Sequence, residues 1–236
     1  MSLIALYKLD DLNGSGLVPD SSGNGLDGTA NGGSFVTGKI GNAFDNEGNS
    51  RILVPYNAMM HQTQMTMSLW FNSDTINYTS NAYILGQYDY ATNKRKWSLF
   101  INSATDTWMF AISPDGTSSG VVYHEPEQSV ETGWHHVAAT WNNTTKLVQF
   151  YYDGEFVTSE ILSTGYSDVE SFLTLGGLAA SNYGDGLMDD TRICDEVLSP
   201  GQIGSLYNGG DGTELAYPWR NKYQHIYRRI LSEQAE

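Results

Sequence analysis

Short bursts of alternating apolar and polar residues run along most of the chain, separated by turns rich in Gly, Asn, Asp and Ser. Such alternation is typical of β-strands that bury one face. We expect at least eleven strands, because no long helical pattern interrupts the bursts, and the pattern predicts an all-β sandwich of two antiparallel sheets. The clearest bursts are Ile4–Leu9, Ile52–Val54, Met65–Phe71, Tyr83–Gln87, Trp97–Asn102, Trp108–Ile112, Val121–Tyr123, Trp134–Trp141, Val148–Tyr152, Leu173–Gly176 and Leu187–Ile193.

A hairpin and a short helix are recognisable by their turn and cap residues. The two strand patterns on either side of Asp153 and Gly154 predict a hairpin with a tight turn. Ser199 suits a helix N-cap and Pro200 the first helical position, so we expect a short helix that ends near 208–210.

The C-terminal residues 211–236 carry a different pattern from the body, 1–210. Apolar residues recur there at helical spacing beside positive charges, which predicts an amphipathic helical extension for docking or oligomerisation. The alternative is that this helix packs against its own sandwich. The residues proposed for assembly are Trp219, Tyr223, Ile226, Tyr227, Ile230 and Leu231.

Composition and charge narrow the class of protein. The chain has 236 residues, of which 40 % are hydrophobic, and 25 glycines, which suits one large β domain. A net charge of −15 argues against a nucleic-acid partner. It permits cation binding, although the acidity can also serve solubility alone.

No stretch approaches the ~20 apolar residues of a membrane span. The chain opens without a signal-peptide pattern. An extracellular or virion-surface location, which we expect, would therefore mean that a leader was removed or that the protein leaves its cell by lysis or assembly.

Several motifs, in order over residues 3–208, resemble those of the laminin-G-like (concanavalin A-like) family of jelly rolls. They are Asp20–Gly28, Gly38–Asp45, Met67–Phe71, Trp134–Ala138, Tyr151–Gly154 and Gly186–Ile193. The resemblance implies a jelly-roll sandwich. It does not imply one ligand, because lectins, adhesion modules and glycosidases share this fold.

The early loop from Asp20 to Gly28 is the candidate metal site. Its side chains and carbonyls offer the oxygen ligands that calcium prefers, and the first and last strands of a jelly roll lie close together. The resemblance implies a calcium ion (Ca²⁺) held by Asp20, Asn24, Gly28 and Asp189. The alternative is an Asx-rich turn that hydrogen-bonds to its own backbone.

A cluster of aromatic and basic residues is the candidate ligand site. Tyrosine rings in loops suit sugar rings, and the basic cluster is unusual in so acidic a chain, so an anionic glycan or a carboxylate-rich partner is expected to bind there. The alternative is a solvated loop with Trp97 in the core. The proposed ligand-binding residues are Tyr88, Tyr90, Lys94, Arg95 and Lys96.

No pattern of catalytic residues stands out. Glycosidases use paired carboxylates, but Asp189 and Asp190 are consecutive on a strand and point apart. His135 and His136 also face opposite sides, so we expect one to pack inside and the other to lie at the surface. The sequence therefore predicts a protein that is not an enzyme.

These observations favour a non-catalytic, calcium-stabilised module that binds carbohydrate or a cell surface. The C-terminal extension would join it to a protein partner or a second copy, on a virion or another assembly, since phage tail and capsid decorations often resemble this fold. One alternative is a purely structural decoration or cement protein without glycan binding. The other is a glycan-degrading enzyme.

Overall fold

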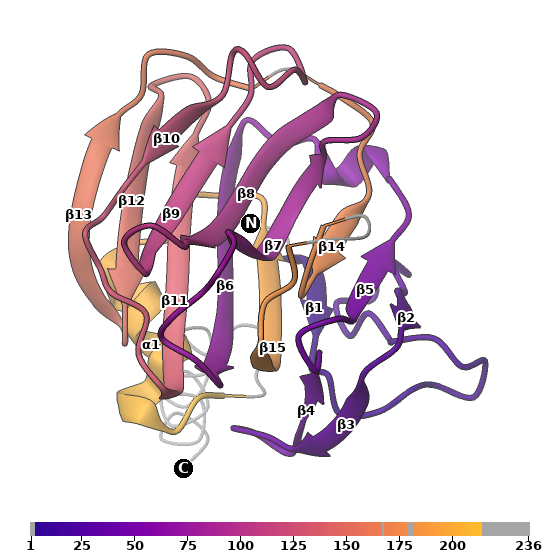
Figure 1. Ribbon diagram of the computed structural model, residues 1–236. Coiled ribbons are helices and arrows are strands. Elements are labelled where there is room, and N and C mark those ends of the chain that lie inside the picture. Colours follow the sequence, from indigo (N-terminus) through magenta and orange to yellow (C-terminus); the bar gives the residue numbers. More distant parts are fainter. Residues whose placement is uncertain (1–2, 167, 179–181, 214–236) are drawn as a thin grey trace, which may run out of the picture.

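The computed structural model describes residues 3–166, 168–178 and 182–213, and these form two antiparallel sheets stacked face to face (Figure 1). In this view β8 passes in front of β6, which shows the two layers. The predicted all-β sandwich is confirmed. The predicted helical extension lies in 214–236, outside the described residues, apart from its first three residues.

Eight strands form the first sheet, here called sheet I, and seven form sheet II. Along sheet I the order is β13 (Glu155–Ile161), β12 (Leu147–Tyr152), β11 (Gly133–Asn142), β6 (Gln64–Ser73), β15 (Gly186–Cys194), β4 (Asn42–Asp45) and β3 (Ser34–Thr37), with β1 (Leu3–Tyr7) also paired to β15. Along sheet II the order is β10 (Val122–His124), β9 (Thr107–Ile112), β8 (Lys94–Asn102), β7 (Ala82–Asp89), β14 (Leu173–Leu175), β5 (Arg51–Val54) and β2 (Thr29–Asn31).

The core lies between the sheets and follows the period of two along each strand. Met67 and Leu69 of β6 and Leu99 and Ile101 of β8 are fully buried members of one apolar cluster. The residues between them face the other side of each sheet. The outer faces of the sandwich are therefore built by the remaining residues of the same strands.

The helix α1 (Pro200–Tyr207) packs on the outer side of sheet I. Two short 3₁₀ turns, η1 (Ala58–Met60) and η2 (Asn208–Gly210), occur elsewhere in the chain, the second directly after α1. The N-cap of α1 is Ser199, whose N–H donates to the Gln202 side chain over 2.8 Å, and the helix ends at Asn208 in the left-handed region. The predicted cap and end are confirmed. The apolar cluster under the helix comprises Leu3, Leu6, Ala138, Tyr151, Cys194, Leu198, Ile203 and Leu206.

The first and last strands of the described sandwich are neighbours, as predicted. Leu6 of β1 lies opposite Arg192 of β15. The pairing of β15 with β6 shifts register between Asp189 and Arg192, where Asp190 has a φ of 42°. No helix among the described residues is long and apolar enough to cross a membrane.

Candidate functional site

The outer face of sheet II carries an aromatic floor that is separate from the core. Leu99 and Ile101 of β8 face the core, whereas Phe100 between them belongs to a second cluster on the opposite side. The Phe100 ring stacks on that of its cross-strand partner Tyr83, with ring centroids 4.9 Å apart. The cluster is thus a small buried apolar layer on the outer side of sheet II, in which Phe100 is 2 % exposed.

A β-bulge places one cationic side chain beside this floor. In the pairing of β7 with β8, Gln87 lies opposite Trp97 and Tyr88 lies opposite Arg95, so Lys96 is an extra residue. An extra residue in one strand changes which side chains share a face. Arg95 is thereby brought to the same side as Tyr88, with its guanidinium carbon 5.8 Å from the centre of that ring.

A pocket of about 400 Å³ opens above the aromatic floor. This volume lies within the range of small-molecule sites, roughly 300–1,000 Å³. Burial raises the pKa of Tyr83 to about 12 and raises that of Tyr88 as well, so both phenols stay neutral at physiological pH. The ring of Tyr83 stacks on those of Phe100 and Tyr88, so Tyr90, which is 50 % exposed, is the lining tyrosine whose ring is open to a ligand. The lining residues are Tyr83, Tyr88, Tyr90, Arg95, Ser118, Leu178 and Asn182.

The Arg95 side chain is held in place by neutral oxygens. Its Nη1 donates to Asn93 Oδ1 over 2.8 Å and to the carbonyl of Gly116 over 3.2 Å, and its Nη2 donates to the carbonyl of Tyr90 over 3.1 Å. The guanidinium carbon also lies 5.9 Å from the centre of the Tyr90 ring. The protein therefore holds the positively charged guanidinium of Arg95 in one position at the pocket.

A second, polar pocket of about 390 Å³ adjoins the first. Asn182 lines both pockets, and its carbonyl accepts a hydrogen bond from the N–H of Tyr83 over 3.0 Å. The two pockets therefore meet at Asn182 and could be contacted by one extended ligand. The second is lined by Gly48, Thr75, Asn77, Tyr78, Thr79, Ser80, Asn182, Tyr183 and Asp185.

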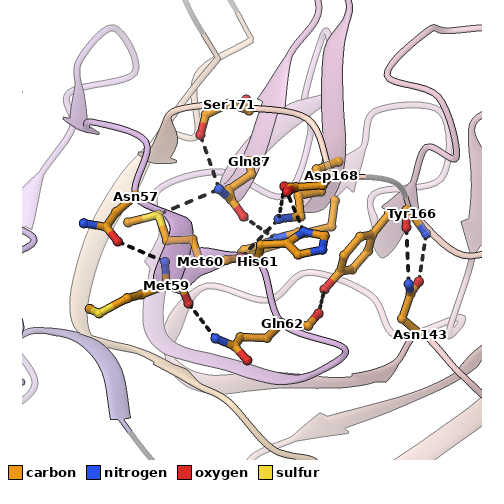
Figure 2. A network of polar contacts seen from close by, with 12 residues as sticks. Asn57, Met59, Met60, His61, Gln62, Gln87, Asn143, Tyr166, Asp168 and Ser171 are labelled. Atoms are coloured by element: carbon orange, nitrogen blue, oxygen red, sulfur yellow. Dashed lines mark hydrogen bonds and ion pairs between the residues drawn. The ribbon is translucent and has the colours of Figure 1, made fainter.

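The two lysines of the predicted ligand site are elsewhere. Lys96 is fully buried; its Nζ donates to the carbonyl of Met60 over 3.1 Å and lies 4.0 Å from Asp168 Oδ1. Burial lowers the pKa of Lys96 to about 8, against the opposing effect of Asp168. Figure 2 shows the surrounding network, in which His61 pairs with Asp168 over 2.9 Å. Lys94 is exposed and is not one of the residues that line the pocket.

Three of the five predicted ligand residues, Tyr88, Tyr90 and Arg95, therefore meet in the pocket. Trp97 lies in the core, as the alternative interpretation expected. Tyr83 is not among the residues that the sequence predicted, although its place next to an inward-facing residue of β7 is the signal of an outward aromatic side chain. The ligand role of all these residues stays a prediction.

The carboxylate of Asp20 is occupied by donors of its own loop and of β1. Its Oδ1 accepts the N–H groups of Leu6 over 3.0 Å and Ser22 over 2.9 Å. Its Oδ2 accepts the Ser22 hydroxyl over 2.7 Å and the N–H of Leu26 over 3.1 Å. Four donors leave this carboxylate without a free direction for a cation.

Of the other proposed ligands in the loop, Asn24 is held through its amide nitrogen and Gly28 through its carbonyl. The Asn24 amide donates to the carbonyls of Leu3 and Ile4 over 2.8 and 2.9 Å. The carbonyl of Gly28 accepts the N–H of Val18 over 2.8 Å. The donor set therefore fits the alternative, a turn that satisfies its own backbone and fastens the loop to β1.

Asp189 is fully buried on β15, opposite Trp70 of β6. Its Oδ2 accepts the N–H of Ile40 over 2.8 Å, and burial raises its pKa to about 7. Within the described ranges no group of three or more His, Cys, Asp or Glu side chains is placed to hold a metal ion. The four proposed residues do not fit a calcium site as they stand, and the calcium hypothesis stays a prediction.

The acids Glu125 and Asp190 both have structural partners. Glu125 Oε1 accepts the hydroxyls of Thr105 and Thr107 over 3.1 and 2.9 Å. Asp190 forms a two-point ion pair with Arg192, in which both hydrogen bonds measure 2.9 Å. These contacts explain the positions of both acids without a catalytic role. The predicted lack of enzyme activity stays a prediction.

The proposed assembly residues all lie in the part of the chain that the structure leaves undescribed, 214–236. Nothing in the described part tests their role. The division into a body, 1–210, and a docking extension, 211–236, therefore also stays a prediction.

Comparison with known proteins agrees with the fold. A family model described as "Concanavalin A-like lectin/glucanases superfamily" matches residues 46–204. C-reactive protein of Sus scrofa is 28 % identical over 142 residues, which cover 56 % of this chain and 61 % of the porcine protein. The match thus spans less than two thirds of that relative.

Solved structures share the architecture at low identity. Domain 4 of AbnA, a GH43 extracellular arabinanase from Geobacillus stearothermophilus solved in complex with arabinotriose, has a TM-score of 0.67 at 22 % identity, covering 86 % of this chain and 97 % of that domain. The binding domain of Paraclostridial Mosquitocidal Protein 1 has a TM-score of 0.68 at 16 % identity, covering 89 % of this chain and 52 % of that one. At such identities the likeness shows the fold alone.

Proposed function

The chain belongs to the concanavalin A-like lectin/glucanase superfamily, and from this premise we propose that it is a non-catalytic module that binds carbohydrate. The ligand binds in the pocket on the outer face of sheet II, between β7, β8 and the segment that holds Asn182.

The observation that carries this proposal is the grouping of three tyrosines around one pocket. Tyr83 and Tyr88 stack with ring centroids 5.4 Å apart, while Tyr90 is half exposed. A tyrosine offers an apolar ring face and a polar hydroxyl, which together match the apolar and hydroxyl-bearing sides of a sugar ring. A pocket with few charges and several such groups suits a saccharide better than an apolar ligand.

The adjoining polar pocket extends the site. It contributes hydroxyl, amide and carboxylate groups, among them Thr75, Asn77 and Asp185, on the far side of Asn182. A ligand that fills both pockets has more than one sugar ring. We therefore favour an oligosaccharide over a single sugar.

The names of similar proteins support a binding role over a catalytic one. One similar structure is a toxin binding domain, and another is a domain of an arabinanase solved with arabinotriose. That arabinanase is described as extracellular, which supports an extracellular location for this chain. Display on a virion or another assembly through 211–236 remains part of the hypothesis. Calcium stabilisation, which the four donors around Asp20 disfavour, is tested separately by chelation.

A glycan array with two matched variants tests the proposal. Tyr90→Ala removes a pocket ring that is 50 % exposed, and Phe156→Ala removes a ring on β13 of sheet I that is 49 % exposed. We expect wild type and the Phe156 variant to bind the same glycan equally. The Tyr90 variant should bind it about tenfold more weakly or worse, since central aromatic contacts dominate binding energy.

Other results decide between the remaining classes. Binding by the Tyr90 variant as tight as that of wild type would place the ligand outside the pocket. No binding to any glycan by wild type would favour a structural decoration protein. Release of reducing sugar from a bound glycan would show that the protein is a glycan-degrading enzyme, contrary to the proposal.

A further inference from the structure

The charge of the pocket is opposite in sign to that of the chain. The protein has 27 acidic residues against 12 Lys and Arg, yet Arg95 is the one charged side chain among the seven described residues that line the pocket. A positive charge in a concave site attracts one kind of ligand group, an anion.

Arg95 is buried without a carboxylate partner. Only 6 % of the residue is exposed, and none of the ion pairs between described residues includes it. Arg192 makes a useful comparison within the same chain, because it is buried as well and has Asp190 as its two-point partner. The fold thus supplies a counter-ion to one buried arginine and leaves the other to neutral oxygens.

Arg95 retains hydrogen-bonding capacity. A guanidinium has five N–H donors. Three of them are engaged by Asn93, Gly116 and Tyr90, which leaves two. Two N–H donors on one positively charged group can bind both oxygens of a carboxylate, and such two-point ion pairs are among the strongest hydrogen-bonded contacts in proteins. Because the three existing bonds fix the side chain, little conformational entropy is lost when an anion binds.

We propose that the pocket selects an acidic saccharide, with the sugar carboxylate on Arg95 and the sugar ring against the exposed part of Tyr90. This inference rests on the proposed carbohydrate function and adds the chemical class of the ligand. An acidic peptide is the weaker alternative, because the tyrosine-lined pocket and the neighbouring polar pocket suit hydroxyl-bearing rings.

Matched pairs of glycans test the proposal on the full chain. Each acidic oligosaccharide, such as an oligogalacturonate, is paired with its neutral methyl ester, and sulfated sugars and acidic peptides form separate arms. We expect wild type to bind the carboxylate form at least tenfold more tightly than the ester, and this preference should shrink as NaCl concentration rises.

Variants of adjacent residues supply the control. Arg95→Gln should bind acid and ester equally, at the affinity that wild type has for the ester, which also shows that the pocket is intact. Lys94→Gln removes the neighbouring exposed charge and should keep the preference. Arg95→Lys should keep part of it, and this variant carries the test if Arg95→Gln fails to fold.

Each outcome decides something. Equal binding of acid and ester by wild type overturns this inference but leaves the carbohydrate function standing. Tighter binding of sulfated sugars or acidic peptides than of carboxylate sugars also overturns it, as does an equal loss of preference in the Lys94 and Arg95 variants. Binding to no glycan at all would instead reject the proposed function itself.

Discussion

Two consecutive histidines show how the environment of a single residue follows from its strand. His136 is 2 % exposed, while His135 is partly exposed and its Nδ1 lies 2.9 Å from Asp153 Oδ2. The prediction that one packs inside and the other lies at the surface is confirmed, because alternate side chains of β11 face opposite sides. The alternation of side chains along β11 does not determine which groups surround the buried His136 ring.

Burial of His136 makes stability depend on pH. Burial, with a smaller effect of the positive Arg192, lowers the pKa of His136 to about 3. The neutral ring therefore contributes stability that is present above about pH 6.5, the unfolded value, and that is lost as pH falls towards 3. Between pH 6 and 4 this loss should be about 2–3 kcal/mol.

The variant His136→Gln isolates that contribution, since glutamine does not titrate. We expect its free energy of unfolding, measured with urea at a series of pH values, to fall less steeply between pH 6 and 4 than that of wild type. All carboxylates are common to both proteins. Parallel curves would show that His136 is not the group responsible.

At the scale of elements, the hairpin β12–β13 illustrates local prediction. Asp153 and Gly154 have φ values of 48° and 79°, and two positive φ values are what a tight hairpin turn requires. A Cβ on Gly154 would lie 2.8 Å from Cβ of Tyr207 on α1. The turn is therefore specified by its own residues and also by the helix packed on it.

We expect Gly154→Ala to destabilise the protein by roughly 1–3 kcal/mol, because the alanine is strained at positive φ and displaces Tyr207. Gly201→Ala in α1 is the matched control, since nothing lies within 4 Å of its added Cβ. That change should be neutral or slightly stabilising. Thermal unfolding of both variants measures the difference; an equal melting temperature in the two would contradict the role of the contact.

The bulge in β8 is an element that the sequence did not reveal. The three consecutive basic residues suggest one exposed cluster, but Lys96 is buried, Arg95 lines the pocket and Lys94 faces solvent. A bulge depends on the register between two strands, here the pairing of Tyr88 with Arg95. No property of the three residues alone encodes that register.

At the scale of the whole molecule, the chain ends meet as the resemblance implied, but their acids have separate partners. β1 pairs with β15, while Asp20 caps the backbone of β1 and Asp189 binds the N–H of Ile40. Because four hydrogen bonds surround the Asp20 carboxylate, this side chain links its loop to β1 without an ion.

We therefore expect EDTA and added calcium to leave the melting temperature of wild type unchanged. Asp20→Asn should lower the free energy of unfolding by roughly 1–3 kcal/mol, or several degrees in melting temperature, with or without EDTA, because an amide cannot accept all four donors. Differential scanning calorimetry checks both. A melting temperature that EDTA lowers and calcium restores would instead support the ion that the sequence resemblance implied.

What the sequence determined by itself is whatever depends on short-range pattern: the alternation that makes strands, the Asp153–Gly154 turn, and the cap at Ser199 that starts α1. These rest on sterics and hydrogen bonds within a few residues. Only the tertiary structure decided which side chains share the pocket, and that the Asp20 carboxylate is filled from Leu6, 14 residues away. Such contacts depend on cross-strand register and on closing long loops, which the local order of residues does not express.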